Sequence, residues 1–507
     1  MTLTKQRKLQ GALFWALLAY SLDATKVRCP PSIIPCVCEG DRAGTKIKRM
    51  SCTDAPLSRS INTDIMLFGS SSKGFPEHNE VVDKLSLIYA GLTSIPAGGF
   101  GKIRIFHLDL QGNNFQDRIS PKGFAGVGKY LRSLSLAWSN VTAIHPKVFR
   151  GMVALRNLSI AENQIREVPG TVFQHLRSLR RLSLAGNPIS HLPGTLFRYQ
   201  TTLELLDLGY CRLRRLPWTL FIGLWNLRVL DLRGNRLSYL ESYTFIDLTM
   251  LHTLLLSHNP IRRLPTDVFH GLPHLTVLRL DESRIQSVAR DAFRDLVELR
   301  SLDLGDNAIA FLADGTLALP GLERLHLDGN ELTEFPMDVR LMPRLRSLDV
   351  SYNRIVTVDR CLYPYLRRLD FFNLQENHLV CDCGLLWLRA LRAEMETRWR
   401  QKTAGVYHSS VPLLSGRCVA PERLRDVGAT SWLDFDCLQT GQYSDLLHSV
   451  GGTTGVQLNV TDLLANGGDG CGIRSDLHDK RINHRRRKLR HLAYLSRDLH
   501  YMRRSPT

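Results

Sequence analysis

The sequence predicts a curved α/β repeat solenoid with a parallel sheet on its concave side and a disulfide-bonded cap at each end. Three observations predict it. An eleven-residue leucine pattern recurs through the middle of the chain, phenylalanine recurs once in most copies, and a group of four cysteines lies on each side of this region. At 507 residues, with 44% hydrophobic and 22% charged residues, the composition is that of a folded chain, and a repeat array reaches this length without a larger globular core.

The repeated unit is L-x-x-L-x-L-x-x-N-x-L, and most copies follow one another at 24 residues. Clear copies begin at Leu155, Leu179, Leu227, Leu251, Leu299, Leu322 and Leu345. The asparagine position falls at Ala90, Asn113, Ser139, Asn163, Asn187, Cys211, Asn235, Asn259, Ser283, Asn307, Asn330, Asn353 and Asn377, which makes about 13 repeats. The pattern resembles the leucine-rich repeat family over roughly residues 29–437, and the resemblance implies a curved horseshoe.

Each column of the repeat has a physical role. In one short strand, Leu182 and Leu184 are predicted to point into the core, because side chains alternate along a strand. Their neighbours Arg181 and Ser183 are then predicted to face the open concave side. The asparagine amide can satisfy backbone groups at the turn after each strand. Cys211 occupies this column, so we interpret it as a buried residue rather than a nucleophile.

Phenylalanine forms a second column, at steps of 24 or 25 residues. Its members are Phe100, Phe124, Phe149, Phe173, Phe197, Phe221, Phe245, Phe269 and Phe293. One inward aromatic in every repeat favours a stacked hydrophobic spine over a cofactor or ligand cage. The column ends after Phe293, where we expect the curvature or flexibility of the solenoid to change.

The cysteine groups are Cys29, Cys36, Cys38 and Cys52, then Cys381, Cys383, Cys418 and Cys437. Each group is expected to pair internally under oxidising conditions. Zinc is the alternative, but only one residue separates the closest cysteines of each group, so no metal is predicted. The groups resemble the caps of extracellular leucine-rich repeat proteins. That resemblance implies disulfides of Cys29 with Cys38, Cys36 with Cys52, Cys381 with Cys418, and Cys383 with Cys437.

The first segment, residues 1–24, is predicted to be a secretory signal peptide, because Lys5, Arg7 and Lys8 precede the apolar run GALFWALLAYSL. The run is too short to cross a bilayer and no second run of about 18 apolar residues occurs, so no transmembrane anchor is expected. The predicted domains that follow are an N-terminal cap at 25–80, repeats at 81–380, a C-terminal cap at 381–437, and a linker with a basic tail at 438–507. We therefore expect a secreted, extracellular protein.

The motifs of hydrolases, metalloproteases, phosphate-binding loops and dinucleotide-binding proteins are absent from the sequence, so we expect no enzymatic activity and no cofactor. Binding is the remaining role. Alternation along the strands predicts an apolar patch on the concave face, formed by Leu205, Tyr210, Val229, Leu255 and Val277 and rimmed by Asp207, Asp231 and Arg279. Such a patch is typical of a protein-binding surface. The alternative, scattered apolar side chains of the kind found on any surface, stays open.

Three N-x-S/T sequons occur, at Asn140, Asn157 and Asn459. We hypothesise that sugar on Asn140 and Asn157 covers the N-terminal third of the concave face. A protein ligand would then be directed toward the apolar patch.

The chain carries a formal net charge of +18, and much of the excess lies in its last 30 residues. The cluster Arg485, Arg486, Arg487, Lys488 and Arg490 predicts binding to heparan sulfate or other sulfated glycans, whereas nucleic acid is not expected outside the cell. An amphipathic helix on a membrane or partner, and a solubilising tail, remain alternatives. A further column of arginines is interpreted as a solvated face in preference to an anion track: Arg132, Arg156, Arg180, Arg228, Arg300 and Arg346.

These observations predict a secreted repeat protein that binds an extracellular protein on its concave face and attaches to matrix or cell surfaces through its tail. The architecture resembles that of chondroadherin, Slit, the Nogo receptor and the acid-labile subunit. Alternatives are a pattern-recognition ectodomain similar to Toll-like receptors and a purely structural matrix protein. Cys471 lies in the linker and is a candidate for a disulfide-linked dimer.

Overall fold

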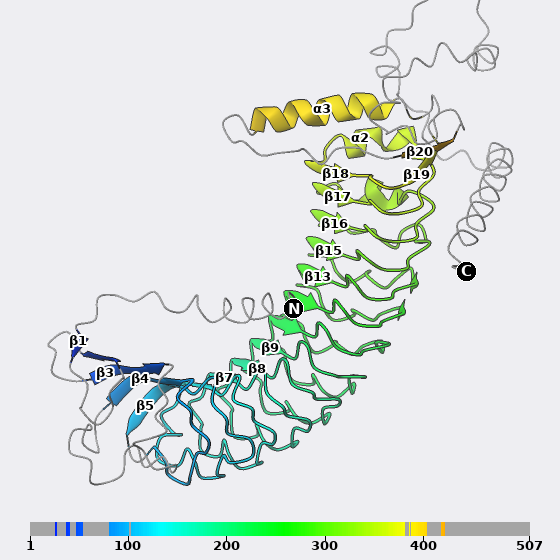
Figure 1. Cartoon of the computed structure of the whole chain (residues 1–507). Helices are drawn as coiled ribbons and strands as arrows, with labels where there is room; N and C mark the ends of the chain where they lie inside the picture. The colour runs from blue at the N-terminus through cyan, green and yellow to red at the C-terminus, as the bar shows by residue number, and fades with distance from the viewer. Residues whose placement is uncertain are drawn as a thin grey trace, which may run out of the picture. The chain divides into compact units, whose positions relative to one another are not determined.

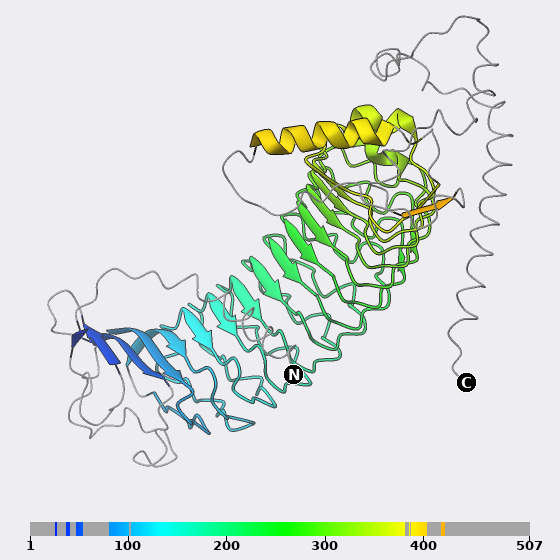
Figure 2. The same ribbon diagram turned by 45° about the horizontal axis from the view of Figure 1, so that its top comes forward.

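The structure is a computed structural model of the whole chain, and it describes residues 26–27, 37–40, 47–53, 81–100, 103–380, 385, 387–402 and 417–420. The described strands lie side by side along one curved face of a solenoid, and the turns that join them form the opposite flank (Figures 1 and 2). This arrangement confirms the predicted solenoid with a parallel concave sheet.

One sixteen-stranded sheet runs through the described part of the chain. Its first strands, β1 and β2, pair antiparallel, and every pairing from β3 onward is parallel. The strands are β1 Lys26–Val27, β2 Val37–Gly40, β3 Ile47–Thr53, β4 Val81–Ile88, β5 Arg104–Asp109, β6 Ser133–Ser135, β7 Asn157–Ser159, β8 Arg181–Ser183, β9 Leu205–Asp207, β10 Val229–Asp231, β11 Thr253–Leu255, β13 Val277–Arg279, β15 Ser301–Asp303, β16 Arg324–His326, β17 Ser347–Asp349 and β18 Phe371–Asn373. From β4 onward, each strand of this sheet corresponds to one of the predicted repeats.

The register of the sheet follows from the leucine columns. Leu206, Leu230, Leu254 and Leu278 are direct partners on successive strands, and none of their surface is exposed. A repeat cannot bury its leucines alone, so stacking in this register produces one continuous core. A second, two-stranded sheet pairs β12 Arg263–Leu264 with β14 Ser287–Val288.

The phenylalanine column is a stacked spine, as predicted. All nine rings are buried, and six neighbouring pairs stack with centroids 5.8 to 6.3 Å apart. Beyond Phe293 the spine is replaced by short helical segments, which are η3 Met337–Leu341, η4 Arg360–Leu362 and α2 Tyr363–Leu366. Buried Asp338, in η3, joins its repeat to the preceding one. Its carboxylate accepts hydrogen bonds from the backbone of Gly315 and Leu317, each 2.8 Å long.

The asparagine column forms the expected ladder. The Asn163 side-chain amide donates to the carbonyls of Leu136 and Ile160, and its oxygen accepts from the backbone of Ser139 and Val141. Each asparagine thereby ties its own turn to the preceding repeat.

Cys211 replaces asparagine in one turn of this ladder. Its thiol is free and buried, and it lies 3.5 Å from the Leu184 carbonyl. Burial raises the pKa of the Cys211 thiol to about 12. The residue is therefore a buried member of the ladder and a poor nucleophile, as the sequence indicated.

Secondary structure at both ends of the solenoid covers the core. At the C-terminal end, β19 His378–Val380 pairs with β20 Arg417–Ala420, and helix α3 Trp387–Lys402 packs Trp387, Leu388 and Leu391 onto the core. Capping is required because a solenoid otherwise exposes the core of its terminal repeats.

Disulfides form at both ends of the described chain. Cys38 in β2, Cys52 in β3 and Cys361 in η4 are disulfide-bonded. Cys361 belongs to neither of the two cysteine groups, so its disulfide was not part of the predicted framework. Cys418 lies in β20. The other capping cysteines, with Cys471, the signal segment and the basic tail, lie outside the described residues, so the four predicted pairings and the domain bounds stay predictions.

Candidate functional site

The predicted concave patch lies on four neighbouring strands, β9, β10, β11 and β13. Leu205, Val229, Thr253 and Val277 are direct partners in the parallel register and form one row. Leu255 lies in the adjacent row, between Asp231 and Arg279. All the apolar members of the two rows are half-buried rather than exposed. Strands about 4.8 Å apart bring neighbouring side chains into contact, so each one covers part of the next.

Tyr210 adds an exposed aromatic ring in the turn that follows β9. Its backbone has a positive φ of 54°, and 44% of its surface is exposed. The ring lies over Gly234 in the next repeat, where a Cβ atom would approach Tyr210 Cδ1 to 2.4 Å. Gly234 is thus required for the ring to lie flat on the following turn.

Asp207 is a desolvated carboxylate at the edge of the patch. It accepts hydrogen bonds from the Ser183 hydroxyl at 2.8 Å and the Gly209 backbone at 3.1 Å. Burial, and after it the charge of Asp231, raises the pKa of Asp207 to about 6. The two hydrogen bonds oppose this shift without cancelling it.

The other charged residues at the rim behave differently. Arg233 binds Asp231 through two guanidinium nitrogens, with the shortest contact at 2.6 Å, so the Asp231 charge is already compensated. Arg279 is exposed. The structure thus brings all predicted patch residues together, but only Arg279 among the rim charges is freely presented to a ligand.

The concave surface on the N-terminal side of the patch consists of small polar side chains. Ser135, Ser159 and Ser183 occupy the same column as Asp207 and are buried. Ser183 was predicted to face the open concave side; it lies in that column, but its hydroxyl is buried and donates to Asp207.

Two of the predicted glycosylation sites lie in the described part of the chain. Asn157 is half-buried in β7, between Ser133 and Arg181 of the neighbouring strands. Asn140 is exposed, and its side-chain amide donates to Asn114 at 2.8 Å. Asn459 and the predicted glycan-binding cluster Arg485 to Arg490 lie outside the described residues. Use of these sites stays a prediction.

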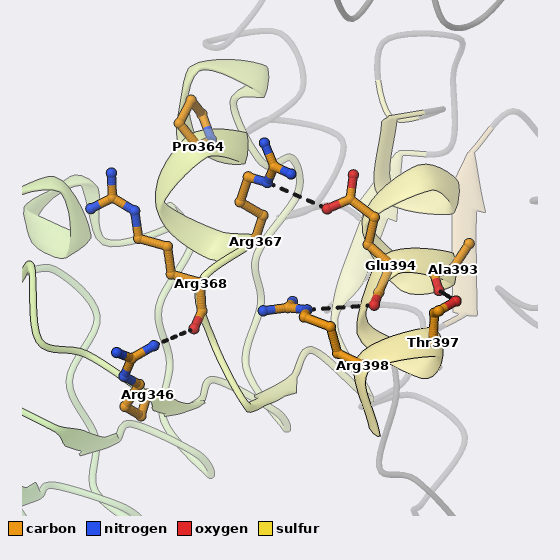
Figure 3. Close-up of a pocket in the computed structure, with 8 residues that line it drawn as sticks. All are labelled: Arg346, Pro364, Arg367, Arg368, Ala393, Glu394, Thr397 and Arg398. Atoms are coloured by element: carbon orange, nitrogen blue, oxygen red, sulfur yellow. Dashed lines mark hydrogen bonds and ion pairs between the residues drawn. The ribbon is translucent and has the colours of Figure 1, made fainter. Parts of the chain in front are cut away.

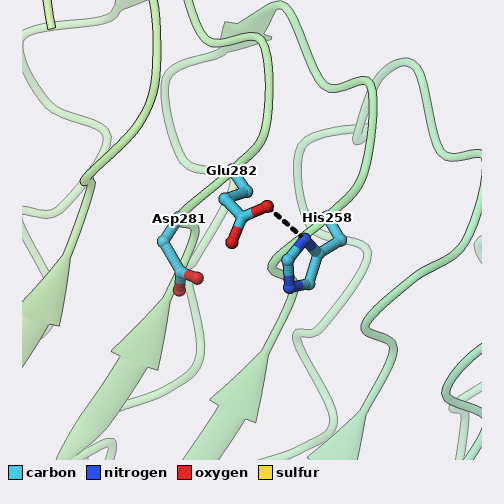
Figure 4. Close-up of side chains that lie close together, drawn as sticks. All are labelled: His258, Asp281 and Glu282. Atoms are coloured by element: carbon cyan, nitrogen blue, oxygen red, sulfur yellow. Dashed lines mark ion pairs between the residues drawn. The ribbon is translucent and has the colours of Figure 1, made fainter. Parts of the chain in front are cut away.

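A group of potential metal ligands, His258, Asp281 and Glu282, lies in the turns that follow β11 and β13 (Figure 4). His258 Nδ1 is 3.0 Å from Glu282 Oε2, and the Ser257 hydroxyl donates to Asp281 at 2.5 Å. A second group, Asp267 with His270 and Asp295, is compensated by Arg294, which is 2.9 Å from Asp267. Hydrogen bonds and ion pairs account for both arrangements without a cation.

Sequence reasoning missed a set of exposed aromatic and aliphatic side chains in the turn segments. Trp218, Ile222 and Trp225 all lie in the segment from β9 to β10, with 66%, 43% and 52% of their surfaces exposed. The signal was present, because the equivalent position to Trp218 holds Gly194 or Ser242 in the adjacent repeats. The periodic pattern identifies residues that recur at a fixed spacing. It does not identify an exposed side chain that occurs in a single repeat.

A family model described as leucine rich repeat matches residues 129–189, 201–261, 249–309 and 320–379. The solenoid consists of leucine-rich repeats. No helix among the residues that the structure describes has the length and apolar character to span a membrane.

The fold is similar to that of Toll, and two further solved structures were matched. Toll in the Drosophila Toll–Spatzle complex is 23% identical with a TM-score of 0.53, and the match covers 69% of this chain and 54% of Toll. A Leptospira interrogans leucine-rich repeat protein is 25% identical, with a TM-score of 0.49 and coverage of 59% and 79%. The ectodomain of the Arabidopsis thaliana receptor kinase GASSHO1/SCHENGEN3 is 23% identical, with a TM-score of 0.47 and coverage of 61% and 40%. This chain therefore spans about half the length of Toll.

Proposed function

We propose that this protein is an extracellular leucine-rich repeat protein that binds another protein through the concave patch. The observation that carries the proposal is the in-register row of Leu205, Val229, Thr253 and Val277 on four neighbouring strands, with the exposed ring of Tyr210 in the turn that follows β9. An apolar centre with an aromatic anchor and a charged rim is the usual composition of a protein-binding surface. Toll, whose fold is similar, is in a complex with Spatzle, which supports the general mode of use.

The small side chains on the N-terminal side of the patch mark one limit of the surface that we expect the ligand to contact. Buried serines offer a ligand little to contact, and a glycan on Asn157 would cover the strands beside them. The ligand is therefore expected on β9 to β13, where side chains are larger and Arg279 is available.

The test is a binding screen of the purified full-length chain against an array of extracellular proteins, followed by affinity measurements with the strongest binder. Val229→Arg places a charge in the centre of the row and is expected to weaken binding at least about 30-fold, as for loss of an interface hot spot. Ser347→Arg is the matched control, because it adds the same charge in the same column on β17. Equal affinity of both variants and the wild type would refute the concave patch.

We also propose that the basic tail attaches the protein to sulfated glycans. The proposal follows from the density of charge at Arg485, Arg486, Arg487, Lys488 and Arg490. Replacing these five residues with glutamine in the full chain is expected to lower the salt concentration needed to elute the protein from heparin. An unchanged salt concentration at elution would refute this role of the tail.

A further inference from the structure

A cavity of about 890 Å³ lies between the last repeats and helix α3, and arginines dominate its lining (Figure 3). Arg346 comes from the residue before β17, Arg367 and Arg368 follow α2, and Arg398 projects from α3. Among the described residues that line the cavity, Glu394 on α3 is the only acidic one. Four arginines and one glutamate give the cavity a surplus of three positive charges.

The single carboxylate is fully engaged by its neighbours. Arg367 Nε lies 3.4 Å from Glu394 Oε2, and the Tyr363 hydroxyl donates to Glu394 Oε1. Burial and this hydrogen bond raise the pKa of Tyr363, so the hydroxyl stays protonated and remains a donor. Glu394 therefore compensates Arg367 and leaves the other three guanidinium groups without a carboxylate among the residues that the structure describes.

These three groups also have few other acceptors. Arg346 donates to the carbonyl of Arg368 at 3.2 Å, and Arg368 lies over the ring of Tyr365. Arg398 donates through Nε to the Glu394 carbonyl at 3.5 Å. The Arg398 Nη2 atom is buried and has no hydrogen-bond partner in the described part of the chain. A buried guanidinium donor without an acceptor is costly, and no carboxylate of the described residues balances the charge of this group.

We propose that this cavity binds a sulfate group carried by an extracellular glycan. Arginine forks bind tetrahedral oxyanions through paired N–H donors, and the arginines here come from three separate elements that line one open pocket. The site differs in position from the basic tail and uses none of its residues. It also differs from the concave patch, so its failure leaves the proposed protein ligand unaffected.

The test measures hydrogen exchange of the full-length chain with and without a heparin-derived tetrasaccharide. Bound sulfate is expected to slow exchange in residues 387–398 of α3 and in α2, and to do so with a measurable Kd. Arg398→Gln is expected to weaken this Kd at least tenfold. Arg228→Gln is the matched control, because Arg228 belongs to the same arginine column as Arg346 and lies far from the cavity in the sequence of repeats.

Arg346→Gln guards against a structural effect of the α3 substitution, because Arg346 is exposed and contacts only a carbonyl. If Arg398→Gln speeds exchange in α3 without ligand, the Kd of Arg346→Gln decides the question. Inorganic sulfate is the second probe. Protection by sulfate and tetrasaccharide alike supports an oxyanion site, and stronger protection by the tetrasaccharide assigns the glycan source. The proposal is wrong if the wild type shows no slowed exchange in α3, or if both cavity variants bind as the wild type does.

Discussion

Two stretches of the same concave column differ in chemistry although their backbones are equivalent. In the serine stretch, Ser135, Ser159 and Ser183 are buried and uncharged. In the stretch that follows, which we call the acidic stretch, Asp207, Asp231, Asp303 and Asp349 occupy equivalent positions, with Leu255, Arg279 and His326 at the positions between them. Leucines and asparagines hold both stretches in the same register, so the repeat accepts either residue type.

The two stretches differ in their electrostatic contribution to stability. Burial, with the charge of Asp231 or Asp281 next in size, raises the pKa of Asp207 and of Asp303. Parallel strands keep such carboxylates close together and partly dehydrated, which disfavours the charged form. The serine stretch has no comparable penalty. The concave face of this solenoid is therefore less stable where it carries these carboxylates than where it carries serines.

The largest expected effect comes from moving a carboxylate into the serine stretch. Ser159 is 1% exposed, and its neighbours in the column are serines that offer no positive charge. Ser159→Asp is expected to lower the free energy of unfolding by about 3–5 kcal/mol, because it buries an unpaired charge. Urea unfolding followed by circular dichroism measures the change. Ser159→Asn is the neutral control of equal size, and equal destabilisation by both would show that volume, not charge, separates the two stretches.

Removing a carboxylate from the acidic stretch is expected to raise the free energy of unfolding. The pKa of Asp207 is raised from 3.8 to about 6 in the folded chain, so the fold binds a proton that the unfolded chain has already lost. The free energy of unfolding therefore falls as pH rises from about 4 to about 6 and is level above that range. Asp207→Asn is expected to stabilise the protein by about 1–3 kcal/mol at pH 7 and to abolish this fall.

The measurement for Asp207 is the urea midpoint from pH 4 to pH 8. Asp231→Asn is an informative partner variant, because it removes the second cause of the shift but leaves Arg233 without its carboxylate. It should lower the pKa of Asp207 without a net gain in stability. A wild-type midpoint whose pH dependence matches that of Asp207→Asn would contradict the desolvated state of Asp207.

The sequence predicted the parts of this molecule that repeat. Leu206, Phe221 and Asn235 could be assigned to core, spine and ladder because each recurs at a fixed interval and each interval has one geometric meaning. The patch residues followed from the alternation of strands. Their half-burial could not be predicted, because it depends on which side chain lies on the next strand.

The arginine cavity escaped sequence analysis for a different reason. Arg346 was interpreted as a solvated member of a column, Arg368 directly precedes the last copy of the repeat, and Arg398 lies in the C-terminal cap. Their proximity depends on how α3 packs on the last repeats, which no periodic pattern encodes. The role of Asp338 also escaped sequence analysis. Its hydrogen bonds to the backbone of Gly315 and Leu317 lie beyond the last residue of the phenylalanine spine.

A smaller effect is expected at Asp328, also in the acidic part of the concave face. Burial and then the charge of Asp349 raise the pKa of Asp328 to about 6, but 32% of its side chain is exposed. Solvent screening reduces the cost, so Asp328→Asn is expected to stabilise the chain at pH 7 by about 1 kcal/mol or less. The gain should disappear below pH 4, where the carboxyl is protonated in both states. A gain that persists at pH 4 would have a cause other than charge.

The smallest expected effect tests whether the serine stretch is free of penalty. The Ser159 hydroxyl is buried and has no partner among the described residues, so Ser159→Ala is expected to stabilise the fold by about 0.5–1 kcal/mol. Ser183→Ala is the matched control, because its hydroxyl donates to Asp207 and its removal should destabilise the fold. Urea unfolding at pH 7 separates the two signs. If Ser159→Ala also destabilises, the hydroxyl has an acceptor in solution, and the serine stretch is a hydrated polar surface on which a ligand could form hydrogen bonds.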